Sequence, residues 1–438
     1  MALFSPRTRY VMFTLGILVR IVTYCFLAPE NNDLHGRVLQ FLVDHHALPL
    51  VWQEHEAHNP PLYYLLAAPI LAWTGSMKMV QLLSLVFSCT TLWVLFRLIQ
   101  DGGLIENASA RLYALLLICF LPQFVMFSLY VSSDALAILL GACLALQTWR
   151  YIRRPCWKEL LLLAVTLSLG LLTKTVFVVA APILLALVAW YPRTRRHGWT
   201  GLLRADVFLI LSLILGGYKF ADNAVRYHDP FFNNMDLQDD DWRIAHRQTY
   251  RGIASLVDVN LERLLISPFM SPVTDGSYPV MLYGTFWFQH IRESNFIRLG
   301  FEKVRYLAWG IFVLALIPSL VFFTGLGGLA RDLPGLLRKF DGARAEDLRA
   351  LMRSTQAMIL CLGILMLWIT AWRYQEFSAM QGRLLFPWMF GGAVVFSRGV
   401  PKGDRGIAAR GVRIAIFGLI ALFLIYLASE MGALVWKR

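Results

Sequence analysis

The chain of 438 residues is poor in charge and in cysteine. Only 16% of its residues are charged, and 28 acidic side chains stand against 41 lysines and arginines. Because soluble proteins carry about 25% charged residues, this composition excludes an ordinary soluble domain. The six cysteines show no spacing typical of a disulfide framework or a zinc site.

Long hydrophilic stretches are also missing, with one exception at residues 219–300. Elsewhere, apolar runs of roughly 16–25 residues recur between short basic loops, and about 20 apolar residues suffice for a helix to cross a membrane. The loops contain neither a P-loop nor a glycine-rich nucleotide-binding motif. We therefore interpret the net charge of +13 as a signal of membrane topology and predict no nucleic-acid partner.

The basic clusters assign the cytoplasmic side, because lysine and arginine are enriched in cytoplasmic loops. This places residues 29–77 outside, with a short re-entrant or interfacial helix at residues 61–75. We predict an all-α, multi-pass protein of the inner (plasma) membrane, with about eleven transmembrane helices and a cytoplasmic N-terminus. The expected parts are an N-terminal transmembrane module (1–218) that contains the first outer segment (29–77), a large outer loop (219–300) and C-terminal transmembrane helices (301–438).

The predicted topology brings polar side chains from distant positions to the outer face. Titratable groups at the boundary with lipid are costly, so they indicate a functional site there. The candidates are Asp33, His35, Glu56, His58, Asp134, Lys174, Arg373 and Arg383.

Asp33 precedes an amphipathic stretch and allows two interpretations. A carboxylate that is shielded from water can act as a general base for an acceptor hydroxyl. An aspartate just before a helix can equally cap that helix.

Lys174 and Arg383 each stand at the edge of an apolar run. Together they would suit a phosphate, for which arginine offers a bidentate fork and lysine a point charge. The alternative is that each side chain only extends to the water at the membrane surface.

Five of the nine histidines lie in the first outer segment, beside acidic residues. Asp33, His35, Glu56 and His58 are conceivable ligands of a divalent metal, although their spacing is not specific to zinc. Solvated histidines and acid–base or sugar-binding roles are the alternatives. We expect that no cofactor is required. Aromatic residues at 278–288 suggest a membrane-interface belt or a sugar-stacking surface.

Several motifs resemble one family when they are taken in order. They are Asn59-Pro60-Pro61-Leu62-Tyr63-Tyr64, Ser132-Ser133-Asp134-Ala135, Leu171-Leu172-Thr173-Lys174 and Gln381-Gly382-Arg383-Leu384-Leu385-Phe386-Pro387. This order resembles the GT-C superfamily of membrane glycosyltransferases, which includes protein O-mannosyltransferases and lipid A aminoarabinose transferases. The chain differs in having Asn31-Asn32-Asp33 where an Asp-Glu pair is common. This difference leaves the register of the catalytic acid and the metal dependence open.

The resemblance implies that Asp33 activates the acceptor and that Lys174 and Arg383 hold the donor phosphate. The implied substrate-binding residues also include His35, Glu56, His58, Tyr63, Asp134 and Arg373. The implied enzyme is a monomeric glycosyltransferase of cell-envelope glycan biosynthesis with its active site on the periplasmic side. It moves a sugar from a polyprenyl-phosphate donor to a lipid, glycan or protein hydroxyl, with inversion. The alternatives are a lipid flippase or small-molecule transporter, and a polyprenyl-pyrophosphate-dependent glycan ligase.

Overall fold

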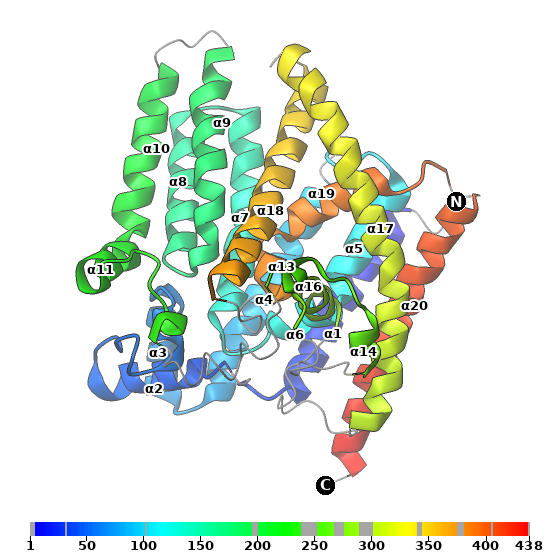
Figure 1. The fold of residues 1–438 in the computed structure, drawn as a ribbon, viewed down its shortest axis with the longest axis horizontal. Coiled ribbons are helices and arrows are strands. Elements are labelled where there is room, and N and C mark those ends of the chain that lie inside the picture. Colours follow the sequence, from blue (N-terminus) through cyan, green and yellow to red (C-terminus); the bar gives the residue numbers. More distant parts are fainter. Residues whose placement is uncertain are drawn as a thin grey trace.

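A computed structural model gives the fold of the protein (Figure 1). It describes residues 5–30, 33–100, 103–194, 200–237, 252–266, 276–288, 301–339, 344–374, 381–403 and 406–436. All regular elements in these ranges are helices, which confirms the predicted all-α class.

The N-terminal half starts with a long helix, passes through short helices in the first outer segment and continues into the bundle. Its elements are α1 (Pro6–Phe26), α2 (His35–His45), η2 (His55–His58), α3 (Leu62–Thr74), α4 (Met77–Gln100), α5 (Ala108–Phe120), α6 (Pro122–Phe127), α7 (Ser133–Arg153), α8 (Trp157–Leu171), η3 (Thr175–Val179), α9 (Ala180–Thr194) and α10 (Thr200–Gly216).

The C-terminal half starts with short helices and continues into three long ones, with a 3-10 helix and one further short helix before the last of them. Its elements are α11 (Tyr218–Tyr227), η4 (Asn234–Leu237), α13 (Ile253–Val257), α14 (Glu262–Ile266), α16 (Tyr278–Trp287), α17 (Phe301–Lys339), α18 (Ala345–Tyr374), η5 (Gly382–Trp388), α19 (Met389–Gly399) and α20 (Ile407–Trp436).

Within the described ranges, six helices are long and apolar enough to cross a membrane, namely α1, α4, α7, α17, α18 and α20. A seventh crossing is possible if α10 and α11, which meet at a bend of 64°, form one span. The predicted number of about eleven is not confirmed, because several of the expected spans are short helices. With 13 residues, α5 extends about 20 Å of the roughly 30 Å that a span needs.

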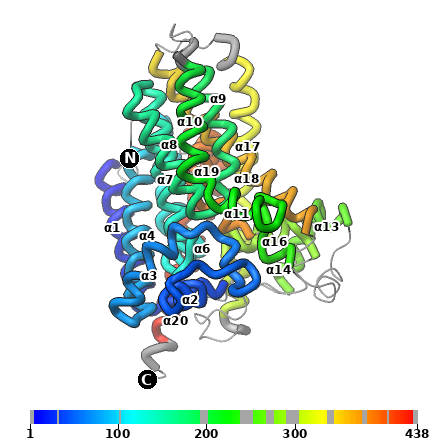
Figure 2. The backbone as a smooth tube through the Cα atoms, turned by 90° about the vertical axis from the view of Figure 1, so that its left-hand side faces the viewer, coloured from blue at the N-terminus to red at the C-terminus, as the bar shows by residue number. Residues whose placement is uncertain are grey.

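The helices form one bundle with a cap of short helices at one end (Figures 1 and 2). On one side α8 packs against α7 and α10, and on the other side α17 packs against α19 and α20. The helices α2 and α3 lie at the end of the bundle where α20 finishes, and we call this the site end. As expected, residues 61–75 form only a short helix there.

A buried arginine of the first span bonds to the end of α5, where a proline interrupts the helix before α6. Arg20 is completely buried, and its guanidinium donates to the backbone carbonyls of Ile118 (3.1 Å) and Cys119 (2.9 Å) at the end of α5. Pro122 has no N–H, so the Ile118 carbonyl lacks its usual helical donor. Each hydrogen bond from a charged group contributes about 1.5–3 kcal/mol. Helix packing therefore accounts for this charge, and it gives no support to a transport path.

The aromatic residues of α16 point into the protein instead of forming a belt at the membrane surface. Tyr278 and Trp287 are buried, and the indole N–H of Trp287 donates to Ser319 of α17 at 3.2 Å. The hydroxyl of Tyr283 donates to the carbonyl of Phe312, also in α17. The belt interpretation does not describe these side chains, because Tyr283 and Trp287 bond to α17 and Tyr278 bonds to Ile364 of α18.

Candidate active site

Four charged side chains from distant parts of the chain meet at the site end. Lys174 donates to one carboxylate oxygen of Asp134, and the Nη1 group of Arg383 donates to Asp33. The same Nη1 lies 3.3 Å from the second oxygen of Asp134. The four side chains are only 6–13% exposed. We call Asp33, Asp134, Lys174 and Arg383 the charge cluster.

Two backbone hydrogen bonds hold the first outer segment against the loops that carry Asp134 and Lys174. The N–H of Val131 donates to the carbonyl of Pro29 at 2.8 Å. The N–H of Leu62, directly after the double proline, donates to the carbonyl of Leu172 at 2.9 Å. The proline motif therefore fixes the register between the first outer segment and the end of α8.

Asp134 lies in the first turn of α7, where a carboxylate is favoured by the helix dipole. The helix begins with Ser132 as its N-cap, whose hydroxyl accepts from the N–H of Asp134 at 3.1 Å. The cap thus fixes the backbone that presents the carboxylate to both cations.

Arg383 is positioned by the glycine that precedes it. The N–H of Gly382 donates to the hydroxyl of Thr285 in α16 at 2.7 Å. A Cβ atom at this position would lie 2.6 Å from the carbonyl oxygen of Leu282, so no larger residue fits without a shift of the backbone. The Gln-Gly-Arg sequence therefore sets η5 tightly against α16.

The guanidinium of Arg383 has hydrogen-bonding capacity left after its ion pairs. Its carbon lies 4.3 Å from the centre of the Phe127 ring, which holds the plane of the group. Its Nε is buried and has no hydrogen-bond partner within the described part of the chain. Leaving a buried donor unsatisfied costs about 1–3 kcal/mol, and more when the group is charged. This edge of the arginine is suited to an anion.

The two cations are each paired with a carboxylate, so the formal charge of the charge cluster is zero, from two positive and two negative groups. Extension to surface water does not describe Lys174 or Arg383, because both are largely buried. Capping does not describe Asp33 either, since Leu34 occupies the N-cap position of α2 with a φ of 58°. Asp33 faces Arg383 instead.

His35 lies beside the charge cluster in a directed chain of hydrogen bonds. The hydroxyl of Tyr64 donates to the backbone carbonyl of Glu56 at 3.2 Å, so it accepts from Nδ1–H of His35 at 2.8 Å. Nε2 of His35 lies 3.1 Å from the hydroxyl of Ser132. Burial lowers the pKa of His35 and so favours the neutral imidazole, in which Nε2 accepts from Ser132.

Glu56 is a buried carboxylate within a group of polar side chains. It accepts from Asn59 Nδ2 at 2.6 Å and from His55 Nδ1 at 3.1 Å, and it lies 3.7 Å from His35 Nε2. Burial alone would raise the pKa of this carboxyl. The hydrogen bond from His55 and the attraction of the neighbouring imidazoles in their protonated form outweigh that effect, so the pKa of Glu56 is lowered.

The structure separates two tyrosines that the sequence leaves equivalent. Tyr63 is completely buried, and its hydroxyl lies toward Ser84 and the backbone of Ser132. Tyr64 supplies the hydroxyl that contacts His35. The assignment of Tyr63 to substrate binding stays a prediction, and the structure adds Tyr64 as a candidate. The sequence could have indicated this difference. Two adjacent rings at the start of a helix point in different directions, so only one of them can face the polar loop.

Arg373 does not join the charge cluster. Its guanidinium pairs with Asp229 at 2.8 Å and with Asp236 at 3.1 Å, both in the segment after α11. The hydrogen bond from Arg373 lowers the pKa of Asp229. Arg373 is therefore separate from the charge cluster, and its assignment to the substrate site stays a prediction.

The predicted metal ligands are used for other contacts. Both ring nitrogens of His35 are engaged, and His58 uses Nδ1 to bond the carbonyl of His55 at 3.0 Å. No group of three His, Cys, Asp or Glu side chains suited to a metal occurs among the described residues. Asp33, His35, Glu56 and His58 therefore do not fit a metal in this arrangement.

Comparison with known proteins gives similarity of fold only. No protein-family model matches the chain, and no curated protein matches its sequence. A similar solved structure is the oligosaccharyltransferase AglB from Archaeoglobus fulgidus in complex with an inhibitory peptide and a dolichol-phosphate. It is 11% identical with a TM-score of 0.47, and the match covers 98% of this chain and 56% of that one. The chain thus spans little more than half the length of that protein.

A second similar structure is ArnT from Cupriavidus metallidurans bound to undecaprenyl phosphate. It is 14% identical with a TM-score of 0.40, and the match covers 90% of this chain and 77% of that one. At this identity the likeness concerns the course of the chain, and the chemistry has to be argued from the site.

Proposed function

We propose that the protein is a membrane glycosyltransferase. It transfers a sugar from a polyprenyl-phosphate donor to an acceptor hydroxyl on the extracytoplasmic side, with inversion at the anomeric carbon. The observation that carries this proposal is the buried Arg383 guanidinium, which keeps an unpartnered Nε beside the ammonium of Lys174 and the carboxylate of Asp33. Two cations and a carboxylate at one point suit the cleavage of a sugar–phosphate bond.

The cations act on the leaving group. As the bond between the anomeric carbon and the phosphate oxygen breaks, negative charge grows on the polyprenyl phosphate. Fixed cations at that oxygen stabilise the transition state more than the ground state. Lys174 supplies a point charge, and Arg383 supplies the directed donors of its free edge.

Asp33 acts on the acceptor. It accepts the proton of the incoming hydroxyl while the oxygen bonds to the anomeric carbon from the face opposite the phosphate. The guanidinium of Arg383 binds Asp33. A phosphate that draws Arg383 toward itself weakens that ion pair and frees the carboxylate for the acceptor hydroxyl.

Asp134 is a positioning residue in this proposal. It holds Lys174 and Arg383 through its two oxygens and touches no reacting atom. His35, Tyr64 and Glu56 form a fixed polar wall next to the cluster, within reach of the sugar or the acceptor. Their contacts restrict the rotamers that the wall can adopt, which suits substrate positioning.

The experiment is a transfer assay with the purified full-length protein in nanodiscs. Radiolabelled polyprenyl-phosphate sugars are supplied one at a time, and a polyprenyl-pyrophosphate sugar is the comparison donor. We expect product from a monophosphate donor and a loss of about 100-fold or more in Lys174→Met, as for other groups that stabilise the leaving charge. Full activity of Lys174→Met, or transfer from the pyrophosphate donor alone, would refute the proposal.

A further inference from the structure

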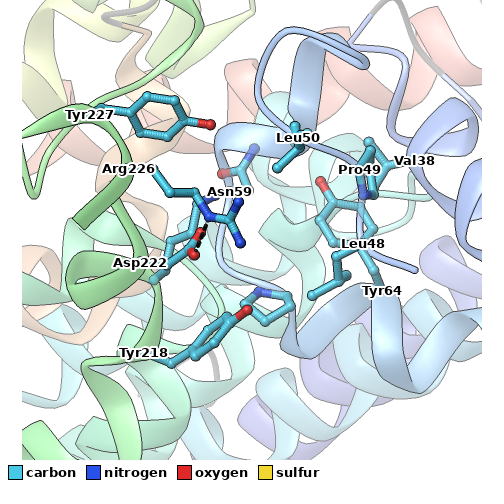
Figure 3. A pocket seen from close by; sticks show the side chains of 13 residues that line it. Val38, Leu48, Pro49, Leu50, Asn59, Tyr64, Tyr218, Asp222, Arg226 and Tyr227 are labelled. Atoms are coloured by element: carbon cyan, nitrogen blue, oxygen red, sulfur yellow. Dashed lines mark hydrogen bonds and ion pairs between the residues drawn. The ribbon is translucent and has the colours of Figure 1, made fainter. Parts of the chain in front are cut away.

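A pocket lies near the charge cluster, between α11 and the first outer segment. It is a cavity of about 60 Å³. Figure 3 shows Tyr218, Asp222, Arg226 and Tyr227 of α11 on one side of it and residues of the first outer segment on the other. The outer segment contributes apolar surface through Leu48, Pro49 and Leu50 and polar atoms through Asn59 and Tyr64.

Lys219 lines this pocket and is an unusual cation. It is only 8% exposed and forms no direct ion pair with a residue that the structure describes, although Asp222 on the same helix favours its charge and Arg226 opposes it. Burial without a direct ion pair is unfavourable for a charged group. A ligand bound in the pocket could supply the counter-charge.

The position of Lys219 within its helix adds to this cost. It is the second residue of α11, which begins after Gly217 without a side-chain cap. The start of a helix carries partial positive charge and free N–H groups, so a cation there is disfavoured and an anion is favoured. The ammonium and the uncapped helix start therefore both favour a negatively charged ligand.

The other charges of α11 are already balanced. Asp222 and Arg226 form an ion pair at 2.5 Å, which is drawn as a dashed line in Figure 3. With this pair formed, the three charged groups from α11 that line the pocket leave one net positive charge, that of Lys219. The pocket is thus suited to a small group with negative charge.

Two pocket residues connect it to the candidate active site. The hydroxyl of Tyr64 contacts His35 at 2.8 Å, and the amide of Asn59 donates to Glu56 at 2.6 Å. The walls come from α2, from residues 48–61, from α3 and from α11, and none of the six single long apolar helices lines the pocket. A lipid-borne donor approaches along those long helices, so the pocket is placed for the other substrate.

We propose that this pocket binds the anionic group, a carboxylate or a phosphate, of the sugar acceptor, with Lys219 as its counter-ion. The assignment to the acceptor rests on the proposed glycosyltransferase function. The binding of an anion at Lys219 does not rest on it, so the two are tested separately.

The first test measures anion binding through the melting temperature of the full-length protein in detergent. Inorganic phosphate and glucuronate are added separately and compared with chloride at equal ionic strength. We expect each effective anion to raise the melting temperature by about 2 °C or more near saturation. This shift should vanish in Lys219→Met and Lys219→Gln and persist in the exposed control Lys402→Met.

Lys174→Met separates the two cation sites in the same test, since phosphate can also bind at the charge cluster. A shift that survives in Lys174→Met and vanishes in Lys219→Met assigns the anion to the pocket, and the more effective anion identifies its class. The proposal would be overturned if the anions do not shift the melting temperature of the wild type. It would also be overturned if Lys219→Met and Lys219→Gln show the same shift as the wild type.

The second test assigns the anion to the acceptor. In the transfer assay, Lys219→Met should raise KM for an acidic acceptor about tenfold and leave KM for the donor unchanged. A raised donor KM with an unchanged acceptor KM would refute the assignment. If the wild type transfers no sugar, the glycosyltransferase function fails, while the melting experiment still decides whether Lys219 binds an anion.

Discussion

Arg383 donates a hydrogen bond to Asp33 across 350 positions of the sequence. This contact joins η5, near the end of the chain, to the first outer segment, near its beginning. It also places the arginine of the Gln-Gly-Arg motif where it can act on both the phosphate and the base. The predictions below start from this pair.

The shape of the Arg383 side chain should matter as well as its charge. Arg383→Lys keeps one positive charge but removes the planar fork and its free Nε. We expect binding of polyprenyl phosphate in nanodiscs to weaken about tenfold or more. The matched control is Arg373→Lys, which alters an arginine paired with Asp229 and Asp236 and should change binding less than about twofold. Equal effects of the two substitutions would contradict the assignment.

Asp134 and Lys174 should be energetically coupled. Asp134→Asn leaves two buried cations with reduced compensation, and removal of one partner from a buried pair costs about 3–5 kcal/mol of unfolding free energy. Asp134→Asn combined with Lys174→Met should cost less than the sum of the single variants, by about 1 kcal/mol or more. Denaturant unfolding in detergent measures all four states. Additive losses would show that the two side chains do not interact.

Arg20 should be needed for stability and not for chemistry. Arg20→Met removes the donors to the carbonyls of Ile118 and Cys119, and we expect a loss of about 3 kcal/mol or more. The exposed Arg7→Met is the control and should have little effect. If the folded fraction of Arg20→Met has no transfer activity despite normal donor binding, a structural role alone is insufficient.

The neutral state of His35 predicts a pH dependence of stability. Because its folded pKa is lowered by burial, its contribution is present above the unfolded value of about 6.5 and is lost as the pH falls through the folded value. Glu56, whose pKa is also lowered, loses its contribution only at more acidic pH. The melting temperature of the wild type should therefore fall between pH 7 and pH 5. His35→Gln should show a flatter profile, and an unchanged slope would exclude His35 as the source.

The meeting of Asp33, Asp134, Lys174 and Arg383 could be predicted from the sequence, although their roles remain predictions. The basic loops fix which ends of the apolar runs share a face, and each of these residues lies at such an end. The ion pairing among them could not be predicted, because it depends on rotamers and on distances of a few ångströms.

Other features depend on tertiary packing that the sequence conceals. Arg373 appears equivalent to Arg383 in the sequence, and only the position of η4 shows that Asp229 and Asp236 engage it. The number of spans could not be settled from the sequence, because breaks such as Leu121-Pro122 shorten helices within apolar runs. Lys219 gave no signal, since its burial arises from the bend between α10 and α11.

The most direct test of the central claim separates donor binding from transfer in Asp33→Asn. Single-turnover transfer and binding of polyprenyl phosphate are measured on the same nanodisc preparation. If Asp33 is the base and the cations hold the phosphate, transfer falls about 100-fold or more while binding stays within about threefold. Unchanged transfer in Asp33→Asn would contradict the account.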